Sequence, residues 1–345
     1  MFTQPVNAQL HRIPVELAGL PLDQEMLGRI VEDMQRNAGR HLPTTAWMQA
    51  GTDGADHRGR PQWNAAGLAQ PWLGFGATPI NPEAVFWYYA YLKAIDTLGL
   101  TDRYFESETR WKPGTSDLLV ADLGTIVDLG LVCPFLDRPD SGHLRVVEVG
   151  GGYGRLAEAF LNVFAGRVKY VLVDAVPASL AFAYEYMTRC NPDLRVGFYY
   201  RDDPLDLGRF DCYILPAWHA EALNGFAFDL AVNVQSMQEM EQHHVDYYLG
   251  WFDSLLRTET GIAYFCNRRD HEFRGEWRYP DHWECLLKQC TPRSWTRDFP
   301  AEVYRKGIRS YSGENRLREA LYRRDLERGA DAVIQTARQL GYRAY

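Results

Sequence analysis

The sequence predicts an α/β fold, a Rossmann-like, doubly wound and mainly parallel sheet, with a mostly helical N-terminal region. From residue 144 onward, short apolar runs alternate with helix-like segments, which is typical of a sheet wound by helices on both faces. The first run, 144–150, lacks strict apolar–polar alternation, as expected of a strand buried on both faces. A glycine-rich turn joins it to the next helical segment, and such turns bind nucleotide-like ligands.

Residues 1–140 are expected to form helices around a long irregular insert. The clearest helix covers 81–99, with proline in its first turn and glycine at its end. A second amphipathic helix is expected over 116–132. The segment 51–82 holds six glycines and four prolines, and we interpret it either as a lid or as a surface loop.

Residues 141–312 are expected to form the sheet domain, and 313–345 a set of C-terminal surface helices. The predicted helices run from the glycine-rich turn to Gly166 and over 177–190 and 245–256. The segment 195–200 is strand-like, but the pattern gives it no place in the sheet. The predicted strands are 144–150, 169–175, 210–216, 228–234 and 261–267.

Charge and composition exclude several classes of function. The net charge of −8 argues against general attraction to nucleic acid or to an anionic membrane. No apolar run approaches the roughly 20 residues of a membrane span, and the N-terminus lacks the pattern of a signal peptide. The six cysteines form no CxxC and no zinc spacing with histidine. We therefore expect a cytoplasmic protein with reduced thiols, no metal, no nucleic acid and no membrane partner.

The glycine-rich turn is compatible with two kinds of ligand. Gly152 to Ala157 satisfies GxGxxA, and Asp174 follows Gly154 by 20 residues, the spacing of a dinucleotide-binding fold. The alternative pattern places Glu148 inside the strand, ahead of the glycines. An acid so close to the turn suits a ligand with an ammonium group better than one with phosphates. S-adenosylmethionine has such a cationic end, and it also has a ribose that Asp174 can hold through its hydroxyls.

The stretch from Arg145 to Arg268 resembles the class I S-adenosylmethionine-dependent methyltransferases, and more narrowly the sugar O-methyltransferase family. The glycine motif is shared by all class I enzymes, whereas the SMQEM and FCN segments are more specific to the narrower family. The absence of an NPPY signature, replaced by NVQS, argues against a DNA adenine methylase. The resemblance rests on VVEVGGGYGRLA (146–157), YVLVDAVPASL (170–180), YILPAW (213–218), FDLAVNVQSMQEM (228–240), YYLGWFDSLL (247–256) and GIAYFCNR (261–268).

The resemblance implies a cofactor site for S-adenosyl-L-methionine. The glycines allow the backbone to approach the methionine portion, Glu148 supports their turn, and Asp174 binds the ribose. The resemblance implies that the segment after the third predicted strand lies next to the adenine. It also implies that the end of the fourth predicted strand lies next to the methyl donor. The implied cofactor-binding residues are Glu148, Gly150, Gly152, Tyr153, Gly154, Asp174, Pro216, Ala217, Trp218, Asn233, Gln235 and Ser236.

The catalytic residues are expected just after the fourth and fifth strands. An alcohol that accepts a methyl group must lose its proton, so a base within hydrogen-bond reach is needed. Glu239 is the first candidate, because it lies in the family-like QEM, and His243, with His244 beside it, is the second. The alternative is that Glu239 accepts backbone hydrogen bonds and that the His pair is a solvated helix start. Asn267 is expected either to orient the substrate or to cap a turn.

The sequence thus predicts an O-methyltransferase that acts on a hydroxyl of a small molecule. The expected acceptor is a sugar or a glycosylated, natural-product metabolite, bound by the N-terminal region. Self-association into a homo-oligomer is left open. Three alternatives remain: an NAD(P)-dependent oxidoreductase, an N- or C-methyltransferase, and a methyltransferase-like module that binds without catalysis.

Overall fold

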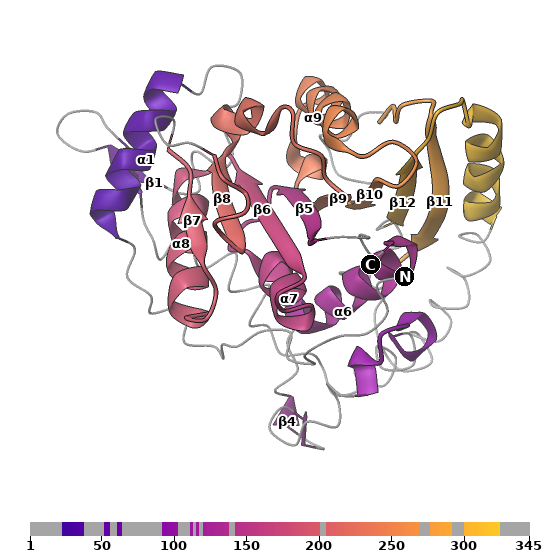
Figure 1. Cartoon of the computed structure of the whole chain (residues 1–345), viewed down its shortest axis with the longest axis horizontal. Helices are drawn as coiled ribbons and strands as arrows, with labels where there is room; N and C mark the ends of the chain where they lie inside the picture. Colours follow the sequence, from indigo (N-terminus) through magenta and orange to yellow (C-terminus); the bar gives the residue numbers. More distant parts are fainter. Residues whose placement is uncertain are drawn as a thin grey trace.

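The computed structural model describes an α/β chain built on one large sheet (Figure 1). The eight strands of this sheet lie in the order β11-β12-β10-β9-β5-β6-β8-β7. The described residues are 23–37, 52–55, 61–63, 92–102, 111–112, 115–116, 120–137, 142–200, 205–268, 277–291 and 300–324. The strands are β5 (Leu144–Val149), β6 (Val168–Asp174), β7 (Val196–Phe198), β8 (Cys212–Pro216), β9 (Leu230–Val234), β10 (Ile262–Cys266), β11 (Trp283–Cys290) and β12 (Pro300–Lys306).

Six consecutive strands, from β7 at one edge to β10, pair in parallel. β12 lies between β10 and β11 and pairs antiparallel with both. The sheet is therefore mainly parallel, and the predicted fold class is confirmed. The helices and 3-10 turns that follow the described strands are α7 (Arg155–Val163), α8 (Pro177–Cys190), η3 (Ala217–Leu223), η4 (Met237–Glu239) and α9 (Gln242–Leu255).

Alternate residues of the central strands enter two separate hydrophobic cores. Val146 of β5 packs into the core formed with α7 and α8, whereas Val147 packs into the core formed with α9. Tyr170 and Val171 of β6 divide in the same way. Because both faces are covered by helices, the strands are apolar throughout, which is why their sequences lack strict alternation.

The N-terminal region contributes two helices to the first of these cores. α1 (Gln24–Asn37) packs on α8, and α6 (Val120–Val132) packs on α7. Residues 92–95 and 100–102 are also helical. Two small antiparallel ribbons are formed by β1 (Thr52–Ala55) with β2 (Pro61–Trp63) and by β3 (Trp111–Lys112) with β4 (Thr115–Ser116).

Several elements differ from the sequence prediction, among them the two N-terminal ribbons, which were not predicted. The segment 195–200, left unplaced, contains the edge strand β7, and neither β11 nor β12 was predicted. The second predicted N-terminal helix begins at Val120 rather than 116, because residues 115–116 pair in β4.

Several predicted features lie outside the described residues or only partly within them. Most of the predicted helix 81–99 and most of the segment 51–82 lie outside the described part, as do residues 325–345. Of the C-terminal helices, residues 312–324 are described and helical. None of the described helices has the length and apolar character needed to cross a membrane. The thiols of Cys133, Cys212, Cys266 and Cys285 are buried.

Candidate functional site

The predicted cofactor residues gather at one edge of the sheet, where the parallel strands end. Val149 pairs with Val173, and Asp174 pairs with Pro216, so the ends of β5, β6 and β8 are level. Asn233 lies one residue before the end of β9, on the other side of β5. This edge is where ligands bind in open α/β sheets.

The glycine turn has a backbone that side chains rarely permit. Gly150, Gly152 and Gly154 have φ values of 73°, 55° and 92°, in the left-handed region. A Cβ on Gly150 would lie 1.9 Å from Oγ of Ser236, so the turn is packed directly against the segment that follows β9. Tyr153 makes an edge-to-face contact with Tyr186 of α8, and the two ring centroids are 5.3 Å apart.

Glu148 lies beneath this turn as a buried acid. Its Oε2 accepts a hydrogen bond of 2.8 Å from the Tyr170 hydroxyl. A Cβ on Gly151 would lie 3.0 Å from the same oxygen, so the carboxyl group supports the backbone of the turn. Burial raises the pKa of Glu148 to about 7, against the lowering effects of Tyr170 and of the Arg155 charge.

Asp174 connects the end of β6 to the glycine turn. Its Oδ2 accepts a hydrogen bond of 3.0 Å from the Gly152 amide, and its Oδ1 accepts one of 2.9 Å from the Val176 amide. Burial raises the pKa of Asp174 to about 6, opposed by these backbone donors and assisted by the charge of Glu239. A carboxylate has about four acceptor positions, so the backbone donors of Gly152, Val176 and Ala175 leave capacity for a hydroxyl donor.

An ion pair from α6 holds the start of α7, and sequence reasoning missed it. Arg155, the first residue after the glycine turn, donates to Oδ2 of Asp128 at 3.0 Å and to the Thr125 hydroxyl at 2.7 Å. Asp128 is completely buried, and its other oxygen accepts from Tyr264 of β10 at 2.7 Å. These contacts connect α6, a helix of the N-terminal region, to the residue that follows the glycine turn.

The segment after β8 is fastened by α1 in a similar way. Pro216 and Ala217 are buried, and Trp218 is 7% exposed. The indole N–H of Trp218 donates to Oδ2 of Asp33 at 2.7 Å, and Nε2 of His219 lies 2.6 Å from the same oxygen. Asp33 lies 185 residues before Trp218, so the sequence around either residue could not predict this contact.

Asn233 and Asn267 form a buried amide pair between β9 and β10. Asn233 donates to the Val149 carbonyl at 2.7 Å and accepts from the Met237 amide at 3.0 Å. Asn267 donates to the Asn233 side chain at 3.0 Å and accepts from the Gln238 amide at 3.3 Å. These contacts shape the turn that follows β9, which is one of the two roles expected of Asn267.

That turn presents the remaining predicted residues. Gln235 is exposed and has a positive φ of 58°, unusual for a residue with a side chain. Ser236 and Glu239 are half-buried. Glu239 is close enough to Asp174 for its charge to raise the pKa of that carboxyl group. Glu239 is therefore placed at the same edge as the glycine turn.

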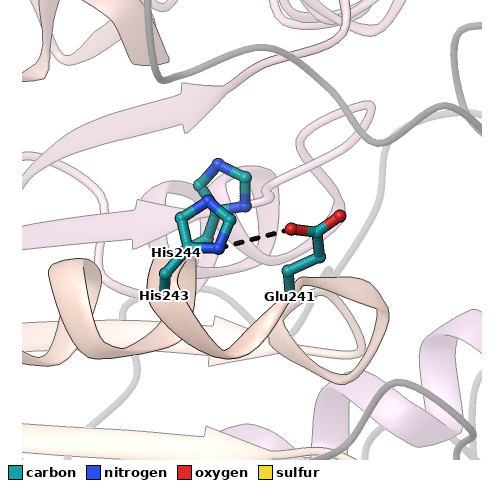
Figure 2. A group of neighbouring side chains, drawn as sticks. All are labelled: Glu241, His243 and His244. Atoms are coloured by element: carbon teal, nitrogen blue, oxygen red, sulfur yellow. Dashed lines mark ion pairs between the residues drawn. The ribbon is translucent and has the colours of Figure 1, made fainter.

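His243 lies in the first turn of α9, as Figure 2 shows. Its Nδ1 is 3.3 Å from Oε2 of Glu241, and its ring centroid is 4.0 Å from that of His244. Both partners of the His243–Glu241 pair are largely exposed. A further histidine, His271, follows the fifth predicted strand and lies outside the described residues.

No family model and no curated protein matches the chain. Among solved structures it is similar to phosphoethanolamine N-methyltransferase 2 of Haemonchus contortus in complex with S-adenosyl-L-methionine. That match has 16% identity and a TM-score of 0.29, over 41% of this chain and 27% of the other. An arsenic(III) S-adenosylmethionine methyltransferase from Chlamydomonas reinhardtii matches with 17% identity and a TM-score of 0.27, over 38% and 42%.

A third similar structure is the rRNA methyltransferase aviRa from Streptomyces viridochromogenes. It matches with 13% identity and a TM-score of 0.35, over 53% of this chain and 84% of the other. The chain thus spans well under half the length of the first two proteins.

Proposed function

We propose that this chain is an S-adenosylmethionine-dependent methyltransferase that transfers a methyl group to a hydroxyl of a small molecule. The observation that carries the proposal is the joining of Asp174 to the glycine turn, with Glu148 beneath it. The glycine backbone of the turn, two nearby carboxyl groups and a level strand edge suit a ligand with a ribose and a cationic amino acid end.

The described residues fit this ligand in three ways. Gly150, Gly152 and Gly154 allow the left-handed backbone that forms the turn which the ligand would approach. Asp174 retains acceptor capacity for a ribose hydroxyl. The segment Pro216–Trp218, next to Asp174 in the sheet, is the wall we assign to the adenine.

The main alternative, an NAD(P)-dependent oxidoreductase, is disfavoured by two observations. Glu148 places a buried carboxyl group under the turn where a dinucleotide's pyrophosphate would lie, and the ionised form of this group would repel the pyrophosphate. In addition, the sheet of the dinucleotide fold is mostly parallel, whereas β12 of this chain runs antiparallel between β10 and β11.

The chemistry asks for alignment and for removal of one proton. The sulfonium of bound S-adenosylmethionine supplies an already activated methyl group. The protein then has to hold the acceptor oxygen in line with the bond that breaks. We assign Glu239 as the base that takes the hydroxyl proton, because it lies half-buried in η4, just after the carboxyl end of β9. Asn233 and Asn267 hold the turn that carries it.

We propose a sugar or a glycosylated metabolite as the acceptor. The support is the resemblance of the SMQEM segment to the sugar O-methyltransferase family, together with a half-buried Glu239 at the sheet edge. A nitrogen or carbon acceptor would lose a different proton from the one that a hydroxyl acceptor loses. A screen of sugar, amine and activated-carbon acceptors with the labelled methyl donor would discriminate among them.

Calorimetric titration tests the cofactor directly. S-adenosylhomocysteine, NAD and NADP are titrated into wild type, Asp174→Ala and the exposed-acid control Asp193→Asn. Binding of S-adenosylhomocysteine alone, lost in Asp174→Ala and kept in the control, is expected. Binding of NAD or NADP instead would overturn the proposal. Circular dichroism of Asp174→Ala separates lost binding from lost folding.

A further inference from the structure

Three side chains capable of binding a metal converge at the start of α9. Glu241, His243 and His244 each offer one ligand atom, and all three atoms lie within 4.8 Å of one another. Figure 2 shows both imidazole rings and the carboxylate on the same turn of chain. Glu241 and His243 are exposed and His244 is half-buried, so an ion can reach them from solvent.

The donor set selects a class of metal. Two imidazole nitrogens and one carboxylate oxygen suit Zn²⁺, Co²⁺ or Ni²⁺. Mg²⁺ and Ca²⁺ prefer a shell made of oxygen atoms and are disfavoured by two nitrogens. Three protein ligands also leave coordination positions open for water or for a donor atom of a bound molecule.

Small side-chain rotations would complete the geometry. With metal–ligand bonds of about 2.0–2.1 Å, the ligand atoms of a tetrahedral site are roughly 3.3–3.5 Å apart. Nδ1 of His243 and Oε2 of Glu241 are already 3.3 Å apart. The rings of His243 and His244 lie 4.0 Å apart between centroids, so the remaining adjustment concerns mainly His244.

Two charges at the start of α9 act on a bound cation in opposite directions. The first turn of a helix carries a partial positive charge, which repels a cation. The carboxylate of Glu241, the residue that precedes α9, carries a full negative charge at the same end. The side chain of Glu241 makes no capping hydrogen bond to the helix, so binding a metal would not cost the helix a cap.

We propose that Glu241, His243 and His244 bind one divalent transition-metal ion, with Zn²⁺ as the representative of the class. The sequence predicts no metal, because its cysteines form no CxxC and no zinc spacing with histidine. Neighbouring residues of a helix do not normally face each other. Here the first turn of α9 brings the two rings together against the preceding glutamate.

The test uses Co²⁺ as a visible probe on the full chain, made without a polyhistidine tag and freed of metal by a chelator. We expect one equivalent to bind, with d–d absorption bands that Zn²⁺ abolishes. His243→Ala and His244→Ala should each weaken binding by at least about tenfold, since even changes to residues that only hydrogen-bond to metal ligands cost that much. His143→Ala, a change to an exposed histidine elsewhere, should leave binding unchanged.

Each other outcome overturns the proposal. Absence of stoichiometric binding at micromolar metal would show that the three side chains form only a solvated helix start. Equal affinity in wild type and in both histidine variants would show adventitious binding elsewhere. Because S-adenosylhomocysteine is titrated into the metal-free protein, failure of this site is distinguishable from failure of the methyltransferase proposal. Glu241→Gln, which keeps the shape of the side chain, provides a second variant if either alanine variant folds poorly.

Discussion

Tyr170 of β6 donates a hydrogen bond of 2.8 Å to Oε2 of Glu148 of β5, and both side chains are buried in the sheet. The phenol partly replaces the water that the carboxyl group loses on folding. It does so incompletely, because burial still raises the pKa of Glu148 to about 7. The acid that supports the glycine turn is therefore the group through which pH should act on the fold.

We predict that Glu148→Gln flattens the pH dependence of stability. The native pKa is raised, so between pH 4.5 and 7 native Glu148 binds more protons than the unfolded chain. This contribution to stability is complete at low pH and is lost as the pH rises through about 7. A rise from 4.5 to about 7 corresponds to about 3 kcal/mol. Glutamine stays neutral, and its carbonyl still accepts from Tyr170.

Urea unfolding at pH 5, 6, 7 and 8 measures this effect. The variant should gain on wild type as the pH rises, while the exposed-acid control Glu32→Gln should follow wild type throughout. Asp174, whose pKa is raised to about 6, contributes a slope of the same sign in both proteins and cancels in the comparison. Parallel stability curves for Glu148→Gln and wild type would show that Glu148 is not the group responsible.

Gly150→Ala should be severely destabilising. The added Cβ would lie 1.9 Å from Oγ of Ser236, and the residue has a φ of 73°. The left-handed backbone costs about 1–2 kcal/mol, and overpacking adds about 1–3 kcal/mol. The free energy of unfolding, measured with urea, should fall by the sum of the two. Binding of S-adenosylhomocysteine should fall with it.

Gly166→Ala is the matched control for Gly150→Ala. Gly166 has a φ of 69°, but a Cβ there meets nothing within 4 Å, so its substitution reports the backbone strain alone. Ser236→Gly removes the clashing atoms and should recover part of the loss when combined with Gly150→Ala. Equal losses at Gly150 and Gly166, with no recovery, would mean that the contact with Ser236 relaxes freely.

The sequence predicted the central strands well and the last two not at all, for a physical reason. The central strands are apolar because helices cover both faces. In β11 and β12 the apolar pattern is interrupted by buried charges: Lys288 of β11 pairs with Glu302 of β12 and with Glu319. Each charge in isolation argues against a buried strand, and only their pairing across the sheet makes the burial tolerable.

Some residues of the candidate site could be predicted from the segment in which they lie, whereas others are defined by contacts with distant segments. Glu148, Gly150 and Asp174 could be predicted because they lie at fixed spacings within or near the glycine-rich turn, which is recognisable from one short segment. Arg155 could be named, but its partner Asp128, 27 residues away, could not. Asp33 lies farther still from the residues it binds. Contacts of this kind follow from how the helices pack, which no single segment encodes.

Asp128→Asn should show what the ion pair with Arg155 contributes. Asp128 is completely buried and Arg155 is 16% exposed, so removing the charge leaves a guanidinium poorly paired. We expect a loss of about 3 kcal/mol, the lower end for a broken buried pair. The asparagine still offers Oδ1 to Tyr264.

Chemical denaturation and S-adenosylhomocysteine titration measure the two consequences. Glu284→Gln, which breaks the more exposed pair with Arg305, should cost less than about 1 kcal/mol. The affinity for S-adenosylhomocysteine should fall in Asp128→Asn, because Arg155 directly follows the glycine turn. A loss no larger than that of Glu284→Gln would show that Arg155 finds equivalent partners.

Asp33→Asn tests whether α1 forms part of the cofactor site. Asp33 accepts hydrogen bonds from the Trp218 indole and the Asn37 amide, and Nε2 of His219 lies at 2.6 Å. Asparagine has one acceptor oxygen instead of two, so one of these donors loses its partner, at about 1–3 kcal/mol. If Trp218 helps to form the adenine wall, S-adenosylhomocysteine should bind more weakly to the variant.

Asp23→Ala separates this role from the stability of α1 itself. Asp23 caps the helix by accepting from the Glu25 and Met26 amides at 2.9 and 3.1 Å. Its removal should cost about 1 kcal/mol of helix stability and leave the contacts of Asp33 in place. Hydrogen exchange of α1 should therefore quicken in both variants, whereas affinity should fall only in Asp33→Asn. Equal affinity in both would show that α1 packs on the sheet domain without shaping the ligand site.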